Sequence, residues 1–404
     1  MKRLEDLRQR IKTNLRDNIL SFWTDHMVDQ AKGGFYGRIS NDMKLDRQAD
    51  KGLVLNTRIL WTYSAAYNCL GDQAYLRLAH RAYDYLQNYF WDKDNKGGYW
   101  MLDYRGRPKE SEKLVYGQAF MIYALAEYYK ASQDRESLDM AIDLYRTLEA
   151  KATDPIYRGY LEGFSANWDY KKGLLISDGE HKDSEKTMNT HLHLLEAYTN
   201  LLRVWEDEGL KDRLRQLVDI MTDLVLNKES WHLDVYFDRQ WGSLTDLVSY
   251  GHDIEGSWLL TEAAEVLADR DYIKKVEQIS LNIAQTVLDQ GLDIDGGLFN
   301  EGTRQGPHDR DKYWWPQAEA LVGFFNAYQI SQDQAFLDAC IKCWDFIDSK
   351  LVDHKNGEWF EYIDIGGQLA GPDEAKADEW KCPYHNSRAC MELLTRLNKK
   401  INKK

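Results

Sequence analysis

Apolar residues recur along most of the chain at steps of three and four positions, with polar and charged residues between them. The stretch with Leu194, Tyr198, Leu201 and Trp205 is one example. This spacing puts apolar side chains on one face of a helix and therefore predicts amphipathic helices. Twelve such helices are predicted, at residues 2–29, 51–70, 73–91, 113–132, 135–150, 187–207, 209–226, 253–268, 271–289, 312–330, 333–351 and 384–398. We therefore expect an all-α protein.

A short glycine-aromatic signature separates successive pairs of helices. Six copies occur, roughly 60 to 70 residues apart, and most alternate briefly as short strands do. They begin at Gly33, Gly97, Gly163, Asp234, Gly296 and Gly357. A repeat of this size cannot bury its apolar face alone, but stacked neighbours can. Closing the stack removes its ends, so the pattern predicts an (α/α)6 barrel, a toroid of six inner and six outer helices.

The connections complete this expected architecture. No stretch rich in proline, glycine or serine divides the chain, so we expect one domain over residues 1–404. Short strands are expected at the glycine-aromatic copies. The long irregular stretches 153–185, 228–249 and 366–383 are expected to form loops over one mouth of the barrel, and loops of this length usually have a function.

Composition and charge narrow the possible partners. The chain has a net charge of −14, and its only basic run is the tail Lys399–Lys404, which argues against nucleic acid as a partner. The first residues lack the apolar core of a signal peptide, and no uncharged apolar run of about 18 residues predicts a membrane span. Five scattered cysteines give no disulfide framework. We expect a cytoplasmic protein that is a monomer or a weak homo-oligomer.

The second helix of each hairpin begins with an unusual polar or aromatic group. These helices follow the short strands, and we take them as the inner ring. Groups at the same phase of a circular repeat point at the same axis, so separate weak signals combine into one candidate site. The groups are Arg58, Tyr116, Asn189 with His193, His252 with Glu255, Trp315 with Glu319, and His385 with Trp380.

The residue types at this phase favour proton transfer. Histidine exchanges protons near neutral pH, and His252 has Glu255 three residues later on the same helical face to orient it. His385 and His193 share the phase of His252. Two histidines on opposite sides of a substrate carbon could remove a proton α to a carbonyl and return one to the opposite face. The intermediate is an enediolate, which a fixed cation such as Arg58 stabilises.

Aromatic residues at the same phase suit a sugar. Trp315, Trp380 and Tyr116 offer flat surfaces for the apolar faces of sugar rings, although each tryptophan taken singly could equally belong to the core.

Metal and redox chemistry are not indicated. His191 is two positions from His193, about 200° around a helix, so the two cannot bind one ion from one face. The chain has no His-Glu-x-x-His motif, P-loop or Rossmann pattern. Cys340 and Cys343 lie in a helical pattern without the preceding strand that a redox motif requires, and we expect them in the core.

Three segments carry a resemblance to a known family: Ser249 to Glu255, Met188 to His193, and Trp314 to Glu319. In order and spacing over about residues 5–398, the motifs resemble the N-acylglucosamine 2-epimerase superfamily, and within it they look most like the cellobiose 2-epimerase branch. The acylglucosamine and mannose-isomerising branches typically have Pro-Gly-His where this chain has Tyr-Gly-His ending at His252. The family fold is an (α/α)6 barrel, in agreement with the repeat pattern.

The resemblance implies a reaction and a role for each residue. The reaction is reversible epimerisation at C2 of the reducing-end glucose of β-1,4 disaccharides, from cellobiose to glucosyl-mannose or from lactose to epilactose. No metal or organic cofactor is implied. The implied catalytic residues are His252 and His385 as the acid/base pair, Arg58 as the holder of the enediolate, and His193 for ring opening or contact with the ring oxygen and O1. The implied substrate-binding residues are Trp315, Trp380, Tyr116, Asn189, Glu319 and Glu255, the last of which would also orient a histidine.

Other functions stay open on the residues alone. An aldose–ketose isomerase would share the pair and the enediolate, and an N-acylglucosamine 2-epimerase would act on a monosaccharide. A glycoside hydrolase on the same toroid needs two carboxylates flanking the bond, from among Asp183, Asp253, Glu255 and Glu319. A non-catalytic sugar-binding toroid would explain the aromatic residues but not three histidines and an arginine together.

Overall fold

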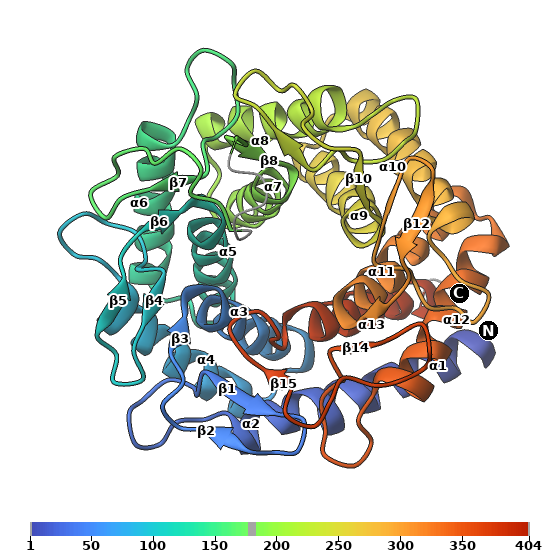
Figure 1. Ribbon diagram of the computed structural model, residues 1–404, viewed down its shortest axis with the longest axis horizontal. Coiled ribbons are helices and arrows are strands. Elements are labelled where there is room, and N and C mark those ends of the chain that lie inside the picture. The colour runs from blue at the N-terminus through green and yellow to red at the C-terminus, as the bar shows by residue number, and fades with distance from the viewer. Residues whose placement is uncertain (1, 177–182, 403–404) are drawn as a thin grey trace.

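The computed structural model describes residues 2–176 and 183–402, and these form two concentric rings of helices (Figure 1). Neighbouring inner helices contact each other in chain order, and the last contacts the first, which closes the ring. The predicted all-α (α/α)6 barrel is therefore confirmed. The inner helices are α3 (Leu53–Leu70), α5 (Val115–Ser132), α7 (Met188–Leu202), α9 (Tyr250–Leu267), α11 (Trp314–Ser331) and α13 (Tyr384–Asn402).

The outer ring differs from the inner ring in its residue pattern. Inner helices such as α5 are buried on nearly every side, whereas the outer helices alternate buried and exposed faces. Aspartate caps the N-terminus of all the outer helices from α4 onward, where its side chain accepts a backbone N–H. The outer rods are α1–η1–α2 (Lys2–Thr13, Asn14–Leu20, Ser21–His26), α4–η2 (Gln73–Tyr85, Leu86–Phe90), α6 (Arg135–Lys151), α8–η3 (Glu208–Ile220, Met221–Val225), α10 (Arg270–Gln290) and α12–η4 (Gln334–Phe346, Ile347–Leu351), where η marks a π-helical segment.

Short antiparallel strands connect each repeat to the next. The strand before an inner helix pairs with a strand that follows the next outer helix, as β6 pairs with β7. The pairs are β3–β4 (Lys51–Gly52, Met101–Leu102), β6–β7 (Lys113–Leu114, Gly163–Phe164), β8–β9 (Lys186–Thr187, Tyr236–Phe237), β10–β11 (Leu247–Ser249, Glu301–Thr303) and β13–β14 (Lys312–Tyr313, Tyr362–Ile363). The remaining strands are β1 (Arg38–Ser40), β2 (Leu45–Asp46), β5 (Pro108–Glu110), β12 (Gly306–Asp309) and β15 (Ala375–Ala377).

A buried lysine and an aspartate, which we call the lysine lock, tie the strand to the loop after the outer helix. In the second repeat Lys113 Nζ lies 3.0 Å from Asp92 Oδ2. Four other repeats have the same pair: Lys51–Asp29, Lys186–Asp154, Lys312–Asp293 and Lys376–Asp353. Burial is tolerable for these charges because each is paired.

A second link, the loop clamp, joins the first turn of an inner helix to the same loop. Gln118 Oε1 accepts the Gly98 backbone N–H at 2.7 Å. The other clamps are Gln317 to Leu298, His191 to Tyr160 and Asp253 to Leu233. Lysine locks and loop clamps therefore fix the starts of the inner helices, where the predicted site residues lie.

The two ends of the chain meet at the seam of the ring, as Figure 1 shows. Arg10 on α1 forms ion pairs with Asp345 at 2.7 Å and Asp348 at 2.9 Å, and Trp23 Nε1 donates to Glu358 at 3.1 Å. Strand β1 pairs with β15, near the other end of the chain. No helix in the described part of the chain is both long and apolar enough to cross a membrane.

Candidate active site

A cavity of about 360 Å³ lies where the inner helices begin. Ligand pockets are commonly of this size. Nine of the ten predicted site residues line it: Arg58, Tyr116, Asn189, His193, His252, Glu255, Trp315, Trp380 and His385. The circular repeat therefore brings together residues that are more than 300 positions apart in the chain.

His252 lies in the first turn of α9 with its ring in the cavity. Its Nδ1 is 2.8 Å from Ser249 Oγ, and its ring centroid is 4.6 Å from that of Trp315. Burial lowers the pKa of His252 to about 3, and the nearby His193 and Arg58 add to this effect. Our prediction that Glu255 orients His252 is wrong, because Ser249 contacts Nδ1 and Glu255 is bound to another group.

His385 lies in the first turn of α13. Its Nδ1 is 2.7 Å from Glu319 Oε1, so the carboxylate holds the ring and leaves Nε2 free. Burial lowers the pKa of His385 well below its ordinary value, and Arg58 and Arg388 reinforce the shift. Glu319 was predicted to contact substrate, but it is fully buried behind His385 and does not line the cavity.

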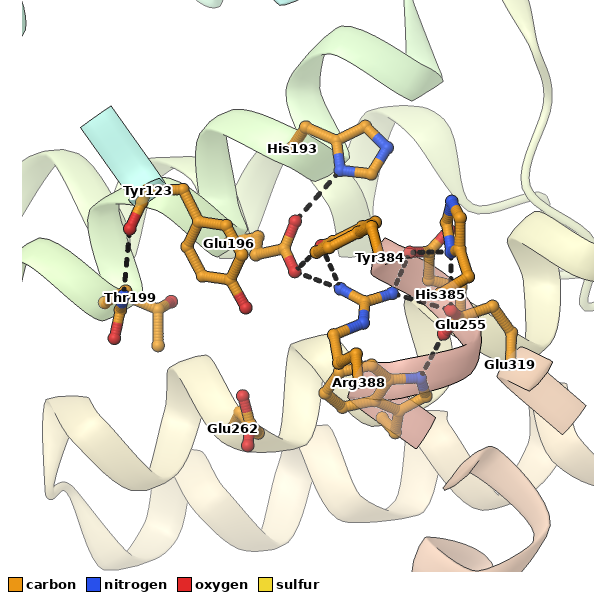
Figure 2. A network of polar contacts seen from close by, with 12 residues as sticks. Tyr123, His193, Glu196, Thr199, Glu255, Glu262, Glu319, Tyr384, His385 and Arg388 are labelled. Atoms are coloured by element: carbon orange, nitrogen blue, oxygen red, sulfur yellow. Dashed lines mark hydrogen bonds and ion pairs between the residues drawn. The ribbon is translucent and has the colours of Figure 1, made fainter. Parts of the chain in front are cut away.

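Arg388, which was not among the predicted site residues, contacts three carboxylates (Figure 2). Its Nη2 donates to Glu255 Oε1 at 2.5 Å and to Glu319 Oε1 at 2.7 Å, and its Nη1 contacts Glu196. Glu196 in turn lies 3.0 Å from His193 Nδ1. We call Arg388, Glu196, Glu255 and Glu319 the carboxylate cluster.

Within the carboxylate cluster, the pKa values of Glu196 and Glu255 are shifted in opposite directions. Burial alone would raise the pKa of Glu196, but Arg388 and His193 lower it to about 2. Burial and the neighbouring Glu319 raise the pKa of Glu255 to about 7. Glu255 Oε2 has no hydrogen-bond partner among the described residues, and Glu255 lines the cavity. This oxygen is therefore an unpaired acceptor buried beside the cavity.

Arg58 supplies a buried positive charge at the cavity wall. Its Nη2 donates to the Tyr116 hydroxyl at 2.8 Å, and its guanidinium carbon is 4.2 Å from the centre of the Phe120 ring. Nearby on α7, Asn189 Oδ1 is buried without a hydrogen-bond partner among the described residues. The wall thus combines a fixed cation with a buried, unpaired acceptor, and both are groups that bind hydroxyl oxygens or hydroxyl protons.

Aromatic and charged residues form the outer part of the cavity. Trp380 is 39 % exposed and Trp315 is partly buried. Four further residues line the cavity without having been predicted: Tyr313, Trp314, Glu361 and Lys381. Tyr313 and Trp314 directly precede Trp315, and Lys381 follows Trp380. For these three residues, their position next to a predicted residue in the sequence could have indicated that they line the cavity.

The carboxylates predicted for glycoside hydrolysis are not paired across the cavity. Asp183 is exposed, and Asp253 is bound to His232 at 2.7 Å. Glu319 lies behind His385, so of the four candidates only Glu255 lines the cavity. Hydrolysis of a glycosidic bond needs two carboxylates that flank it. The four predicted candidates therefore provide no such pair; Glu361, the other carboxylate that lines the cavity, was not among them.

One group in the described chain has metal-ligating atoms close together. Glu255, Glu319 and His385 offer atoms within 4.8 Å of one another. The Arg388 guanidinium already lies against both carboxylates, so a metal cation would have to displace a positive charge. His191 does not line the cavity, and its Nδ1 lies 2.7 Å from the Thr187 carbonyl oxygen.

Comparisons with known proteins give consistent results. A model of the family described as N-acylglucosamine 2-epimerase (GlcNAc 2-epimerase) matches residues 34–389. A cellobiose 2-epimerase of Bacteroides fragilis is 44% identical over 391 residues, which cover 96% of this chain and 99% of that protein. Another of Dictyoglomus turgidum is 41% identical and covers 98% of this chain and 100% of that protein. The solved structure of a cellobiose 2-epimerase from Bacillus thermoamylovorans has a TM-score of 0.93 and 40% identity, and the match covers 97% of this chain and 100% of that chain.

Proposed function

Because the chain belongs to the N-acylglucosamine 2-epimerase family of carbohydrate epimerases, we propose that it epimerises C2 of the reducing-end glucose in β-1,4 disaccharides. Cellobiose would give glucosyl-mannose, and lactose would give epilactose. The names of the relatives at 41% and 44% identity support the disaccharide substrate.

The observation that carries the proposal is the pair of imidazoles in one cavity. His252 lies on α9 and His385 on α13. The centroid of the Trp315 ring is 4.6 Å from the centroid of the His252 ring and 5.7 Å from that of the His385 ring. Each ring has its Nδ1 held by a protein group, Ser249 or Glu319, so each presents Nε2 for proton transfer.

The reaction begins when the sugar ring opens to the aldehyde. One imidazole then takes the proton from C2, and the electron pair of the broken C–H bond forms the C1=C2 bond of an enediolate with negative charge on O1. The other imidazole, protonated, gives its proton to C2 from the opposite face, and the carbonyl re-forms. The reverse reaction exchanges the two roles, so each histidine acts as base in one direction and as acid in the other.

The remaining residues support this chemistry. Arg58 and the Tyr116 hydroxyl stabilise the charge on the enediolate oxygen. His193, held by Glu196, assists ring opening at the ring oxygen and O1. Asn189 and Glu255 accept hydrogen bonds from sugar hydroxyls. Trp315 and Trp380 bind the apolar faces of the rings.

Deuterium incorporation tests the proposed reaction. Incubation of the protein with cellobiose in D₂O should give glucosyl-mannose labelled at C2, because the abstracted proton exchanges with solvent on the histidines. NMR and mass spectrometry measure the label and its position. An unlabelled 2-epimer would contradict the enediolate route, and a cellobiose-derived ketose as main product would favour the isomerase alternative. Mannose and N-acetylglucosamine, tested in parallel, report on the monosaccharide activities.

Metal removal should leave turnover unchanged, because Arg388 rather than a metal ion neutralises the carboxylates beside His385. The measurement is the initial rate on cellobiose before and after incubation with EDTA followed by desalting. Activity that is lost with EDTA and restored by a divalent metal would contradict a metal-free site.

A further inference from the structure

The fourth repeat, which carries His252, has no lysine lock. The lysine position two residues before the inner helix is Val248, and the aspartate position in the loop is Asn227. Asn227 still makes the local turn, because its Oδ1 accepts the N–H groups of Glu229 and Ser230. The ionic link from strand to loop is thus missing beside a proposed acid/base residue.

A different ion pair connects the first turn of the inner helix to the loop in this repeat. Asp253 Oδ1 accepts the Leu233 N–H at 2.7 Å, and Asp253 Oδ2 lies 2.7 Å from His232 Nδ1. In the three other loop clamps the residue is a glutamine or, at His191, an imidazole whose pKa burial lowers to about 4. Asp253 is fully buried, and burial raises its pKa, so its charged form needs a partner of opposite charge. His232 in the loop supplies this countercharge.

The pair acts on the residue next to His252. Asp253 and His252 are consecutive in the first turn of α9, with His252 in the cavity and Asp253 bound to the loop behind it. We propose that His232 and Asp253 form a positioning pair, which fixes the first turn of α9 and thereby the His252 imidazole. This inference rests on the proposed function. Neither residue lines the cavity, so both act through His252.

The surroundings of His232 favour its protonated form. Its Nε2 lies 3.2 Å from Gln290 Oε1, so both ring nitrogens face oxygen acceptors, and only the imidazolium donates to both. Burial lowers the pKa of His232, but Asp253 and Gln290 outweigh it and raise the pKa above its ordinary value. The charged or titratable groups that face it are Asp253 and Tyr250 on α9 and, in its own loop, Asp234, which pairs with Arg304.

The sign of the pH dependence follows from this arrangement. The positioning pair is complete at pH values below the raised pKa of His232. It weakens as pH rises through that value, because a neutral ring turns a lone pair toward one acceptor and leaves the buried Asp253 without a countercharge. We therefore expect kcat to fall on the alkaline side with the titration of His232.

Substitutions at Gln290 test this without disturbing the core, because Gln290 is exposed at the end of α10. Gln290→Glu places a charged acceptor at Nε2 and should move the alkaline limb of kcat on cellobiose up by about 0.5 to 1 pH unit. Gln290→Leu removes the acceptor and should move the limb down by a similar amount. A role in stability alone gives no such opposite shifts, so limbs that coincide with wild type, or that move the same way, would overturn the proposal.

Substitutions within the pair test the positioning directly. His232→Gln and Asp253→Asn should each lower kcat about 10- to 100-fold, with KM changed less than about threefold, since small displacements of reacting groups cost this much. The double variant should resemble the worse single variant, because the two residues act as a unit. The isotope effect on kcat with C2-deuterated cellobiose should rise as proton transfer becomes slower.

Tyr272→Phe is the matched control. It removes a hydrogen bond between outer helices of the same region, from the Tyr272 hydroxyl to Asp219 at 2.8 Å, and should lower thermal stability with kcat unchanged. His232 and Asp253 variants that behave like this control, or that raise KM alone, would overturn the positioning role. If the wild-type protein does not epimerise cellobiose, the proposed function fails. If it does and the Gln290 variants match it, only the positioning pair fails.

Discussion

Replacing His385 by alanine is expected to lower kcat on cellobiose by about 10³-fold or more, because a positioned proton-transfer group contributes about 10² to 10⁴. His252→Ala should have an effect of the same size. Each single variant keeps one imidazole and should therefore still exchange the C2 hydrogen of one epimer with D₂O, without forming the other epimer. The two variants should differ in which epimer exchanges, which NMR of each disaccharide measures.

A buried histidine outside the cavity provides the control. His191 clamps the Tyr160 N–H, and the second and fifth repeats use glutamine at this position. His191→Gln should therefore keep both the fold and turnover. A His385→Ala or His252→Ala variant that is folded and turns over at the wild-type rate would remove that residue from the proposed pair.

Replacing Arg388 by methionine is expected to lower the free energy of unfolding by about 3–5 kcal/mol, the usual cost of removing one partner from buried ion pairs. The variant leaves the buried carboxylates of Glu196, Glu255 and Glu319 without the guanidinium that contacts all three. Urea unfolding at pH 7 measures the loss. The deficit should shrink at lower pH, because uncompensated carboxylates take up protons in the folded protein and this uptake stabilises it.

Arg396, further along α13, offers a comparison on the same helix. It bonds Glu392 at 3.1 Å and the side chain of Asn326 at 3.0 Å near the opposite end of the barrel. Arg396→Met should cost about 1 kcal/mol or less, as partly solvated pairs do. If Arg388→Met cost no more than Arg396→Met, the carboxylate cluster would not depend on its guanidinium.

The ring of helices was predictable because its evidence is local and repeated. Each helix follows from apolar spacing within its own stretch, and the recurring glycine-aromatic copies fix the number of hairpins. The phase of the repeat then places residues as distant as Arg58 and His385 on one wall. Six weak signals were enough to predict one site, because equivalent positions in the repeats of a closed ring all face the same central axis.

The partners of the charged groups were not predictable in the same way. Spacing along α9 places Glu255 one turn from His252, but Arg388 approaches from α13 and binds Glu255 instead. A charged residue follows each of the three site histidines by three positions: Glu196 after His193, Glu255 after His252 and Arg388 after His385. This shared spacing indicates that charged groups lie one helical turn beyond the histidines. Which carboxylates the arginine binds depends on how the neighbouring inner helices cross, and the sequence pattern does not specify this crossing.

The seam between α1 and the last hairpin has a consequence for synthesis on the ribosome. The nascent chain emerges with α1 first, yet the partners of Arg10 and Trp23 lie about 335 positions later. Until those partners are synthesised, part of the apolar surface of the first helices stays exposed, and exposed apolar surface favours aggregation and chaperone binding of a growing chain. Since α13 also carries His385, a chain that stops before α13 lacks one imidazole of the proposed acid/base pair, and we expect no epimerisation from it.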